Sequence, residues 1–234
     1  MLEVRDMDVG YYKDLNILSR LCLDVKPKQI VTILGANGVG KSTSLKAIYG
    51  FLRPNGGTIH LGGAPIIDVP THERINLGLA YIPQHPGIFR DMTVEENLML
   101  GAWTFRRDKA RIARKMDENY ARFPVLKEKR RQPAGQLSGG QQRMIEIGRT
   151  LMGEPKVLLV DEPTAGLSKI YAEEVYQMLR DLKEREDLGI LLVDQEIRHA
   201  LRIADYVYVL ELGRNKFEGP PSEFSDLAKA FWVG

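Results

Sequence analysis

Hydrophobic residues in this chain form short runs that alternate with longer amphipathic segments. The runs are rich in aliphatic and β-branched residues and have the length of buried strands. They predict strands at Leu2–Val9, Ile17–Val25, Gln29–Leu34, Thr58–Leu61, Leu79–Ile82, Val157–Val160, Ile190–Val193 and Tyr206–Leu210. Helical patterns lie between them at Ser42–Phe51, near Lys169–Lys183 and near Ile197–Ile203. This alternation predicts a largely parallel sheet covered by helices.

The segment between Pro86 and Met152 has a different character, because it is helix-forming and carries clusters of basic residues. We interpret it as an inserted helical subdomain. Thr93-Val94-Glu95-Glu96 has the pattern that begins a helix. Several large apolar side chains precede or follow this start, and some of them must belong to the core. They are Ile88, Phe89, Met92, Leu98, Met99 and Trp103.

Composition narrows the class of protein. The chain has 234 residues, of which 44% are hydrophobic and 27% are charged, as in an ordinary globular protein. Its formal net charge is only +2, which argues against a nucleic-acid binder that relies on bulk charge. The one cysteine, Cys22, excludes an intrachain disulfide and fits a reducing compartment. No apolar run approaches the roughly 18 residues of a membrane span. The N-terminus also lacks the pattern of a signal peptide, so we expect neither secretion nor membrane insertion.

A glycine-rich loop follows the third predicted strand and precedes a helix. Its sequence is Gly35-Ala36-Asn37-Gly38-Val39-Gly40-Lys41-Ser42, which matches the phosphate-loop pattern in the correct context. Gly35, Gly38 and Gly40 let backbone N–H groups approach phosphate oxygens, and the helix dipole favours an anion. We expect Lys41 to reach the β- and γ-phosphates, Ser42 to bind Mg²⁺ and Thr43 to add a hydroxyl donor.

A second motif is the apolar strand Val157–Val160 followed by Asp161 and Glu162. Ligands of open parallel sheets gather at the carboxyl ends of strands, where both acids are expected. Asp161 is placed to hold the Mg²⁺ shell. Strand alternation turns Glu162 to the other side, where it would polarise the water that attacks the γ-phosphate.

The third motif is Leu137-Ser138-Gly139-Gly140-Gln141, a pentapeptide expected by chance in only roughly 3 in 10,000 chains of this length. Ser138 is a good N-cap, and apolar residues follow it at helical spacing. Its small residues expose N–H donors at a helix start, which indicates a second anion-binding site.

With these motifs in this order, the chain resembles the ATP-binding cassette (ABC) family over essentially its whole length. The resemblance implies one α/β domain, residues 1–234, with a P-loop NTPase (RecA-like) core sheet, an antiparallel β subdomain and the inserted helical subdomain. The core would comprise 1–85 and 154–234, and the helical subdomain 86–153. In this family two cassettes pair head to tail, which implies that Ser138, Gly139, Gly140 and Gln141 act on the partner's ATP.

Three further positions gain a role from the resemblance. Gln84 matches the glutamine that contacts Mg²⁺ and the attacking water and senses the transporter subunit. Tyr12, or its neighbour Tyr11, matches the aromatic residue that stacks on adenine, and Tyr12 fits the spacing slightly better. Asn37 lies inside the phosphate loop, where a structural role is favoured over a catalytic one.

Two departures from the family pattern are informative. Ala165-Gly166-Leu167-Ser168 places Ser168 where the family often has aspartate, and Gln195 occupies the place of the switch histidine. His199 follows four residues too late to replace it. With the C-terminal Phe231-Trp232-Val233-Gly234, these features resemble one ATP-binding subunit of importers for branched-chain amino acids, and also the related urea-type cassettes.

The resulting hypothesis is an ATPase motor of an importer, bound at the cytoplasmic face of the membrane. Its partners would be permease subunits and a second ABC ATPase chain, with a heterodimer favoured and a homodimer open, and indirectly a solute-binding protein. ATP and Mg²⁺ would be bound, and no nucleic acid. The alternatives are urea or amide uptake, lipopolysaccharide export, a soluble ABC ATPase, or a phosphate-loop kinase, which would not need the pentapeptide. No residue of such a motor encodes the transported solute.

Overall fold

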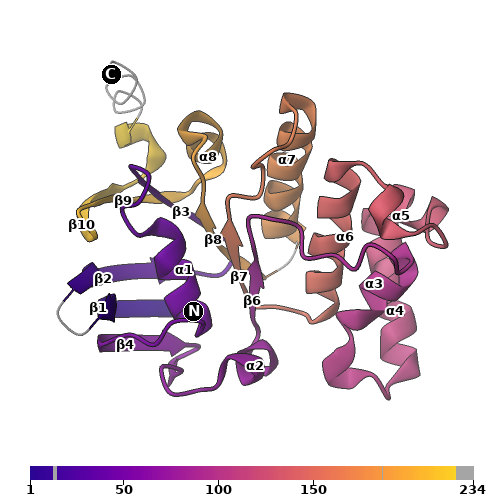
Figure 1. Ribbon diagram of the computed structural model, residues 1–234, viewed down its shortest axis with the longest axis horizontal. Helices are drawn as coiled ribbons and strands as arrows, with labels where there is room; N and C mark the ends of the chain where they lie inside the picture. The colour runs from indigo at the N-terminus through magenta and orange to yellow at the C-terminus, as the bar shows by residue number, and fades with distance from the viewer. Residues whose placement is uncertain (13–14, 186, 225–234) are drawn as a thin grey trace.

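The computed structural model describes residues 1–12, 15–185 and 187–224, which form two sheets and a set of helices (Figure 1). The smaller sheet is antiparallel, with strand order β2-β1-β4-β5. Its strands are β1 (Leu2–Tyr12), β2 (Leu15–Val25), β4 (Gly56–Leu61) and β5 (Ala64–Pro65). The larger sheet has strand order β10-β9-β3-β8-β7-β6. Its strands are β3 (Ile30–Gly35), β6 (Leu79–Ile82), β7 (Val157–Asp161), β8 (Gly189–Val193), β9 (Tyr206–Glu211) and β10 (Arg214–Gly219).

Strands β9, β3, β8, β7 and β6 run parallel, and β10 pairs antiparallel with β9. Parallel pairing brings the carboxyl ends of β3, β6, β7 and β8 to one edge of the sheet. Asp161 is paired with Val193 in the register of this edge. Segments that lie far apart in the sequence therefore meet there, which is where an open α/β sheet places its ligand.

The two faces of the larger sheet bury two separate cores. Leu158 and Val160 of β7 belong to the core that includes residues of α6, α7 and α8. Val157 and Leu159 belong to the other core, with residues of α1 and of the antiparallel sheet. Successive side chains of a strand point to opposite faces, so a continuous apolar strand serves both cores at once.

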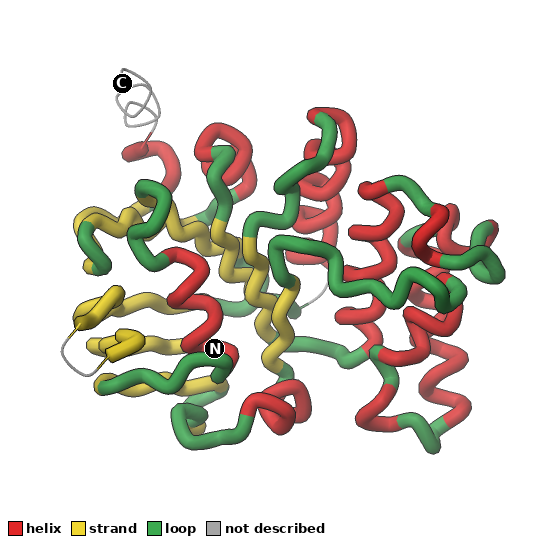
Figure 2. The backbone as a smooth tube through the Cα atoms, in the orientation of Figure 1, coloured by secondary structure: helices red, strands yellow, loops and turns green. Residues whose placement is uncertain are grey.

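The helices are α1 (Lys41–Tyr49), α2 (Thr71–Arg74), α3 (Val94–Leu100), α4 (Lys109–Arg122), α5 (Pro124–Glu128), α6 (Gly139–Met152), α7 (Lys169–Arg185) and α8 (Ile197–Ile203). The helices α3 to α6 gather at one end of the molecule, which Figure 2 shows as helices and loops. Capping boxes begin two of them, at Thr93 for α3 and at Ser138 for α6. Each box satisfies backbone N–H groups that have no partner within the helix.

The hydrophobic pattern predicted most of these elements, apart from some boundaries, two strands and the short helix α2. The bounds expected for β6 and α8 are those of the structure. Helix α1 spans Lys41–Tyr49 instead of Ser42–Phe51, because Gly50 adopts a left-handed conformation that ends it. Strand β10 was not predicted, since most of its residues are exposed and it lacks an apolar run. The two-residue β5 was also missed.

Candidate nucleotide-binding site

The glycine-rich loop connects β3 to α1, and its geometry depends on glycine at position 40. Gly40 is the N-cap of α1 with φ of 105°, and a Cβ there would lie 2.5 Å from Cδ2 of Leu18. A side chain is therefore excluded both by the backbone conformation and by close packing. The backbone of this loop is left open to an approaching anion at the start of α1.

The side chain of Lys41 folds back onto the glycine-rich loop, so that its amine contacts the backbone of the loop. Its Nζ donates hydrogen bonds to the carbonyl oxygens of Gly35, at 2.8 Å, and Ala36, at 3.0 Å. Burial lowers the pKa of this amine, and the carboxylates of Glu162 and Asp161 oppose that effect. The ammonium group is thus held near the loop, within the electrostatic influence of both acids.

Ser42 and Asp161 meet across the sheet edge. The Ser42 hydroxyl donates to Oδ1 of Asp161 at 2.7 Å, and the hydroxyl of Tyr81 donates to Oδ2 at 2.9 Å. Within the described residues no group of three or more His, Cys, Asp or Glu side chains is arranged to hold a metal. One carboxylate beside one hydroxyl fits Mg²⁺, which takes few protein ligands and completes its shell with phosphate and water oxygens. Tyr81 was not identified from the sequence.

Glu162 is nearly buried and receives two amide donors on the same oxygen. Nε2 of Gln84 lies 2.7 Å from its Oε2, and Nε2 of Gln195 lies 2.8 Å from that atom. The expectation that strand alternation directs this side chain was wrong, because β7 ends at Asp161 and Glu162 has φ of 43°. The backbone N–H of Glu162 donates to the carbonyl of Val193 at 2.8 Å and holds this unusual conformation.

The backbone around Gln84 is held by a buried arginine of α6. The guanidinium of Arg143 donates to the carbonyl oxygens of Pro83, at 2.8 Å, and Gln84, at 2.6 Å. It also pairs with Glu146, and both side chains are 1% exposed. Glu146 in turn accepts from the N–H of Gly87 at 2.8 Å. Sequence reasoning missed this pair, although two charges three residues apart on the core-facing side of a helix were a signal.

The signature pentapeptide forms the start of α6. The Ser138 hydroxyl accepts from the N–H of Gln141, and the Gln141 side chain accepts from the N–H of Ser138, both at 3.3 Å. Its glycines allow close packing, because a Cβ at Gly140 would lie 2.7 Å from the ring of Tyr171. A Cβ at Gly139 would lie 3.2 Å from Leu167. The pentapeptide is therefore packed against the segment that follows Glu162.

A cavity of about 540 Å³ lies beside the phosphate loop. It is lined by Asn37 and Val39 of the loop, by Ile17 of β2, and by Phe217 of β10, among others. Asn37 is exposed and Thr43 is half-buried. The size suits the base and ribose of a nucleotide. Ile17 and Phe217 were not foreseen as lining residues, because β10 itself was not predicted.

The remaining residues singled out from the sequence either lie away from the phosphate loop and Glu162 or have side chains outside the part of the chain that the structure describes. Tyr11 and Tyr12 end β1, but their side chains lie outside what the structure describes, as do Phe231–Gly234, so the adenine-stacking prediction stays a prediction. His199 stacks on Tyr176, with ring centroids 5.1 Å apart and an interplanar angle of 8°. It does not take the place of Gln195.

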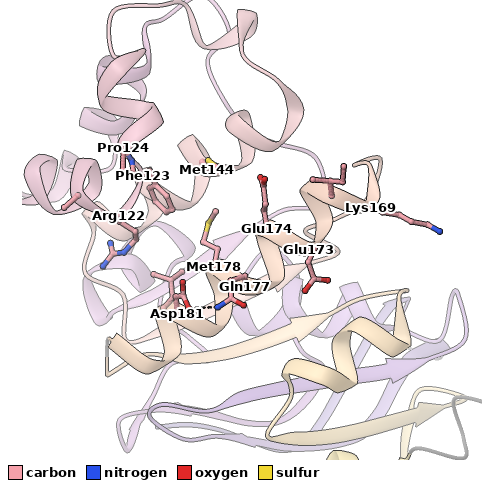
Figure 3. A pocket seen from close by; sticks show the side chains of 13 residues that line it. Arg122, Phe123, Pro124, Met144, Lys169, Glu173, Glu174, Gln177, Met178 and Asp181 are labelled. Carbon is pink, nitrogen blue, oxygen red and sulfur yellow. Dashed lines mark hydrogen bonds between the residues drawn. The ribbon is translucent and has the colours of Figure 1, made fainter.

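A larger groove, of about 930 Å³, runs between α7 and the end of α4 with the start of α5 (Figure 3). It is lined by the apolar side chains of Phe123, Met144 and Met178 and by acidic side chains such as Glu174. None of its lining residues belongs to the phosphate loop, the Asp161–Glu162 pair or the signature pentapeptide. The groove therefore has no part in the candidate nucleotide site.

The fold and the site together define an α/β protein built to bind a nucleoside triphosphate. The ABC transporter family model matches residues 18–165. The chain therefore belongs to the ABC transporter family, as an ATP-hydrolysing subunit. No helix in the described ranges is long and apolar enough to cross a membrane.

Individual relatives cover nearly the whole chain. It is 38% identical over 229 residues to a probable branched-chain amino acid transport ATP-binding protein LivF from Archaeoglobus fulgidus, covering 98% of this chain and 96% of the relative. Identity to the high-affinity branched-chain amino acid transport ATP-binding protein BraG of Pseudomonas aeruginosa is 39%, covering 87% of this chain and 86% of the relative. The lipopolysaccharide export system ATP-binding protein LptB of Haemophilus influenzae is 36% identical, covering 91% of this chain and 88% of the relative.

Solved structures agree with this assignment. The cbiO1 subunit from Clostridium perfringens, part of the ABC transporter complex cbiONQ, superimposes with a TM-score of 0.88 at 27% identity, covering 98% of this chain and 92% of that one. An ATP-binding cassette of an ABC transporter in its ADP conformation has a TM-score of 0.84 at 25% identity, covering 100% and 99%.

Proposed function

We propose that this chain is the ATP-hydrolysing motor of an importer for branched-chain amino acids. The observation that carries the hydrolytic role is the convergence of Gln84 and Gln195 on the carboxylate of Glu162, beside Ser42 and Asp161. The solute class is supported by the relatives LivF and BraG, whose names describe branched-chain amino acid transport.

Each residue of the site has a distinct task in this proposal. Lys41 and the loop N–H groups bind the β- and γ-phosphates, and the hydroxyl of Thr43 adds a donor. Ser42 and Asp161, with the side chain of Gln84, hold Mg²⁺, which supplies charge neutralisation on the phosphates. Glu162 polarises the attacking water and takes up its proton. Gln84 and Gln195 orient the Glu162 carboxylate through their amide N–H groups.

A second cassette is part of the proposal because the two anion-binding helix starts lie on different faces of the sheet. Leu45 and Ile48 of α1 pack in one core, whereas Ile145 and Ile147 of α6 pack in the other. Ser138, Gly139, Gly140 and Gln141 then close on ATP held by the partner, in a heterodimer or a homodimer. In this arrangement Tyr12 stacks on the adenine, and Asn37 shapes the loop.

We also propose that the surface next to Gln84 docks a permease and holds the chain at the cytoplasmic face of the membrane. Phe89 is 55% exposed, Met99 49% and Trp103 64%, whereas Leu98 between them is fully buried. Exposed large apolar groups that gather in one patch are typical of a protein interface, and these three lie within 20 residues of Gln84 in the sequence. A solute-binding protein would act indirectly, through the permease.

Reconstitution tests this function. The chain, purified with the membrane subunits that accompany it, is placed in vesicles with a solute-binding protein loaded with leucine, and ATP turnover and leucine uptake are measured. Both should rise together with the loaded protein. The relative LptB favours lipopolysaccharide export as a second candidate. That alternative would be established if ATP turnover does not change with the loaded binding protein but rises when lipopolysaccharide is added.

A further inference from the structure

Asp194 lies next to Gln195 at the carboxyl end of β8, and its carboxylate is only 3% exposed. Its Oδ1 accepts a hydrogen bond from the backbone N–H of Glu196 at 3.0 Å. Its Oδ2 accepts from the hydroxyl of Tyr176 at 2.8 Å. One carboxylate therefore binds the backbone on the far side of Gln195 and, at the same time, the helix α7.

Tyr176 is fully buried and connects a second segment to this carboxylate. Its hydroxyl lies 3.1 Å from Oγ1 of Thr164, and Thr164 comes two residues after Glu162. On its ring face Tyr176 stacks against His199 of α8. The tyrosine thus stands between the segment that follows Glu162 and the turn that carries Gln195.

Glu162 is consequently bound at the end of β8 through both its backbone and its side chain. The backbone of Glu162 is bound to Val193, the residue before Asp194, and the side chain of Gln195 reaches Glu162. A hydrogen bond from an amide is strongly directional, so a small rotation of the turn at Gln195 would break its contact with Oε2 of Glu162. The Asp194 carboxylate, which accepts from the hydroxyl of Tyr176 and from the N–H of Glu196, ties the turn to α7.

We propose that Asp194 and Tyr176 are positioning residues that hold the Gln195 turn so that its amide meets the carboxylate of Glu162. The inference rests on the proposed function, because it assigns Gln195 and Glu162 to ATP hydrolysis. A purely stabilising role explains the pair less well. Burying a carboxyl group in a core costs free energy, which apolar residues of similar volume would avoid.

The central test removes one hydroxyl. Tyr176→Phe keeps the ring and its stacking on His199 but loses the bond to Asp194. In the purified transporter assembly we expect turnover at saturating ATP to fall roughly three- to tenfold, as for one lost orienting hydrogen bond, with KM unchanged. Tyr208→Phe is the matched control, since Tyr208 is also buried and its hydroxyl accepts from the N–H of Asp24 at 3.1 Å, on the antiparallel sheet. It should retain wild-type turnover.

A double-mutant cycle separates positioning from stability. In a Gln195→Ala background, Tyr176→Phe should have no further effect on turnover, because the group it positions is gone. Additive losses, or unchanged turnover in Tyr176→Phe, would overturn the proposal. Asp194→Asn supplies a second variant if Tyr176→Phe does not fold, and the same outcomes apply. If instead Glu162→Gln and Gln195→Ala both keep full turnover, the proposed hydrolytic site itself is wrong.

Discussion

The amide nitrogen of Gln195 lies 2.8 Å from Oε2 of Glu162, and it donates its hydrogen bond without carrying a titratable proton. A histidine at this position would change charge between about pH 5 and 8, whereas an amide does not. Gln195 can orient the carboxylate but cannot exchange a proton with it. In the proposed function the general-base role therefore falls on Glu162 alone.

This division of roles predicts unequal effects of two substitutions. Glu162→Gln removes the base and should lower ATP turnover by roughly 10²–10⁴, whereas Gln195→Ala removes only an orienting amide and should lower it about tenfold. Turnover at saturating Mg-ATP in the assembled transporter is the measurement. If Gln195→Ala loses as much activity as Glu162→Gln, Gln195 takes part in the chemistry and the division is wrong.

Complementation between two inactive chains tests the composite site. Lys41→Ala removes the phosphate contact and Ser138→Arg blocks the signature, so each variant alone should form no intact site. Mixed dimers should recover at most one site per pair. Turnover is followed against the mixing ratio and against total concentration. Full activity of either single variant, at a dilution where the chain is monomeric, would contradict hydrolysis by a dimer.

Phe89 is predicted to face a permease. In a Cys22→Ser background, Phe89→Cys should crosslink to a membrane subunit of the assembled transporter, and chain stability should change by less than about 0.5 kcal/mol, as for an exposed site. Phe51→Cys is the control, since Phe51 is equally exposed, at 55%, and follows α1. Equal crosslinking from both positions, or none from Phe89, would count against the proposed surface.

The buried ion pair of Arg143 and Glu146 predicts that the free energy of unfolding depends on whether one partner or both partners are replaced. Arg143→Met leaves Glu146 buried without its partner and should cost about 3–5 kcal/mol of unfolding free energy, and Arg143→Met with Glu146→Leu should cost distinctly less. Burial already raises the pKa of Glu146 above its ordinary value. The single variant should therefore lose more stability at pH 8 than at pH 5. Denaturant unfolding of both variants at the two pH values checks this, and equal losses would refute it.

Asp194→Asn should stabilise the chain while lowering its turnover. Burial raises the pKa of Asp194 above the ordinary 3.8, so the folded state holds the proton more tightly than the unfolded chain. The contribution of this group to stability therefore falls as pH rises from about 3.8 through the folded pKa. The difference between variant and wild type should grow over that interval and stay constant above the folded pKa. A variant less stable than wild type at pH 7 would contradict this.

The sequence by itself determined the features that depend on neighbouring residues. The capping boxes at Thr93 and Ser138 join residues three apart, and the glycine-rich loop needs only the strand before it and the helix after it. Buried strands such as Val157–Asp161 were evident because a parallel strand is apolar on both faces. These local rules were enough to place Lys41, Asp161 and the signature.

Only the tertiary structure decided which distant residues meet. Ser42 and Asp161 are 119 residues apart, and Gln84 and Glu162 are 78 apart, and both contacts depend on the order of strands in the sheet. Tyr81 and Tyr176 carry no local motif, and for Arg143 only the spacing to Glu146 was a signal, so the contacts of all three were decided by the tertiary structure. Their hydrogen bonds form because a buried polar group without a partner is costly, and folding determines which partner is in reach. The left-handed backbone at Glu162 is likewise held by a bond to another strand, so no rule of alternation within β7 could have given its direction.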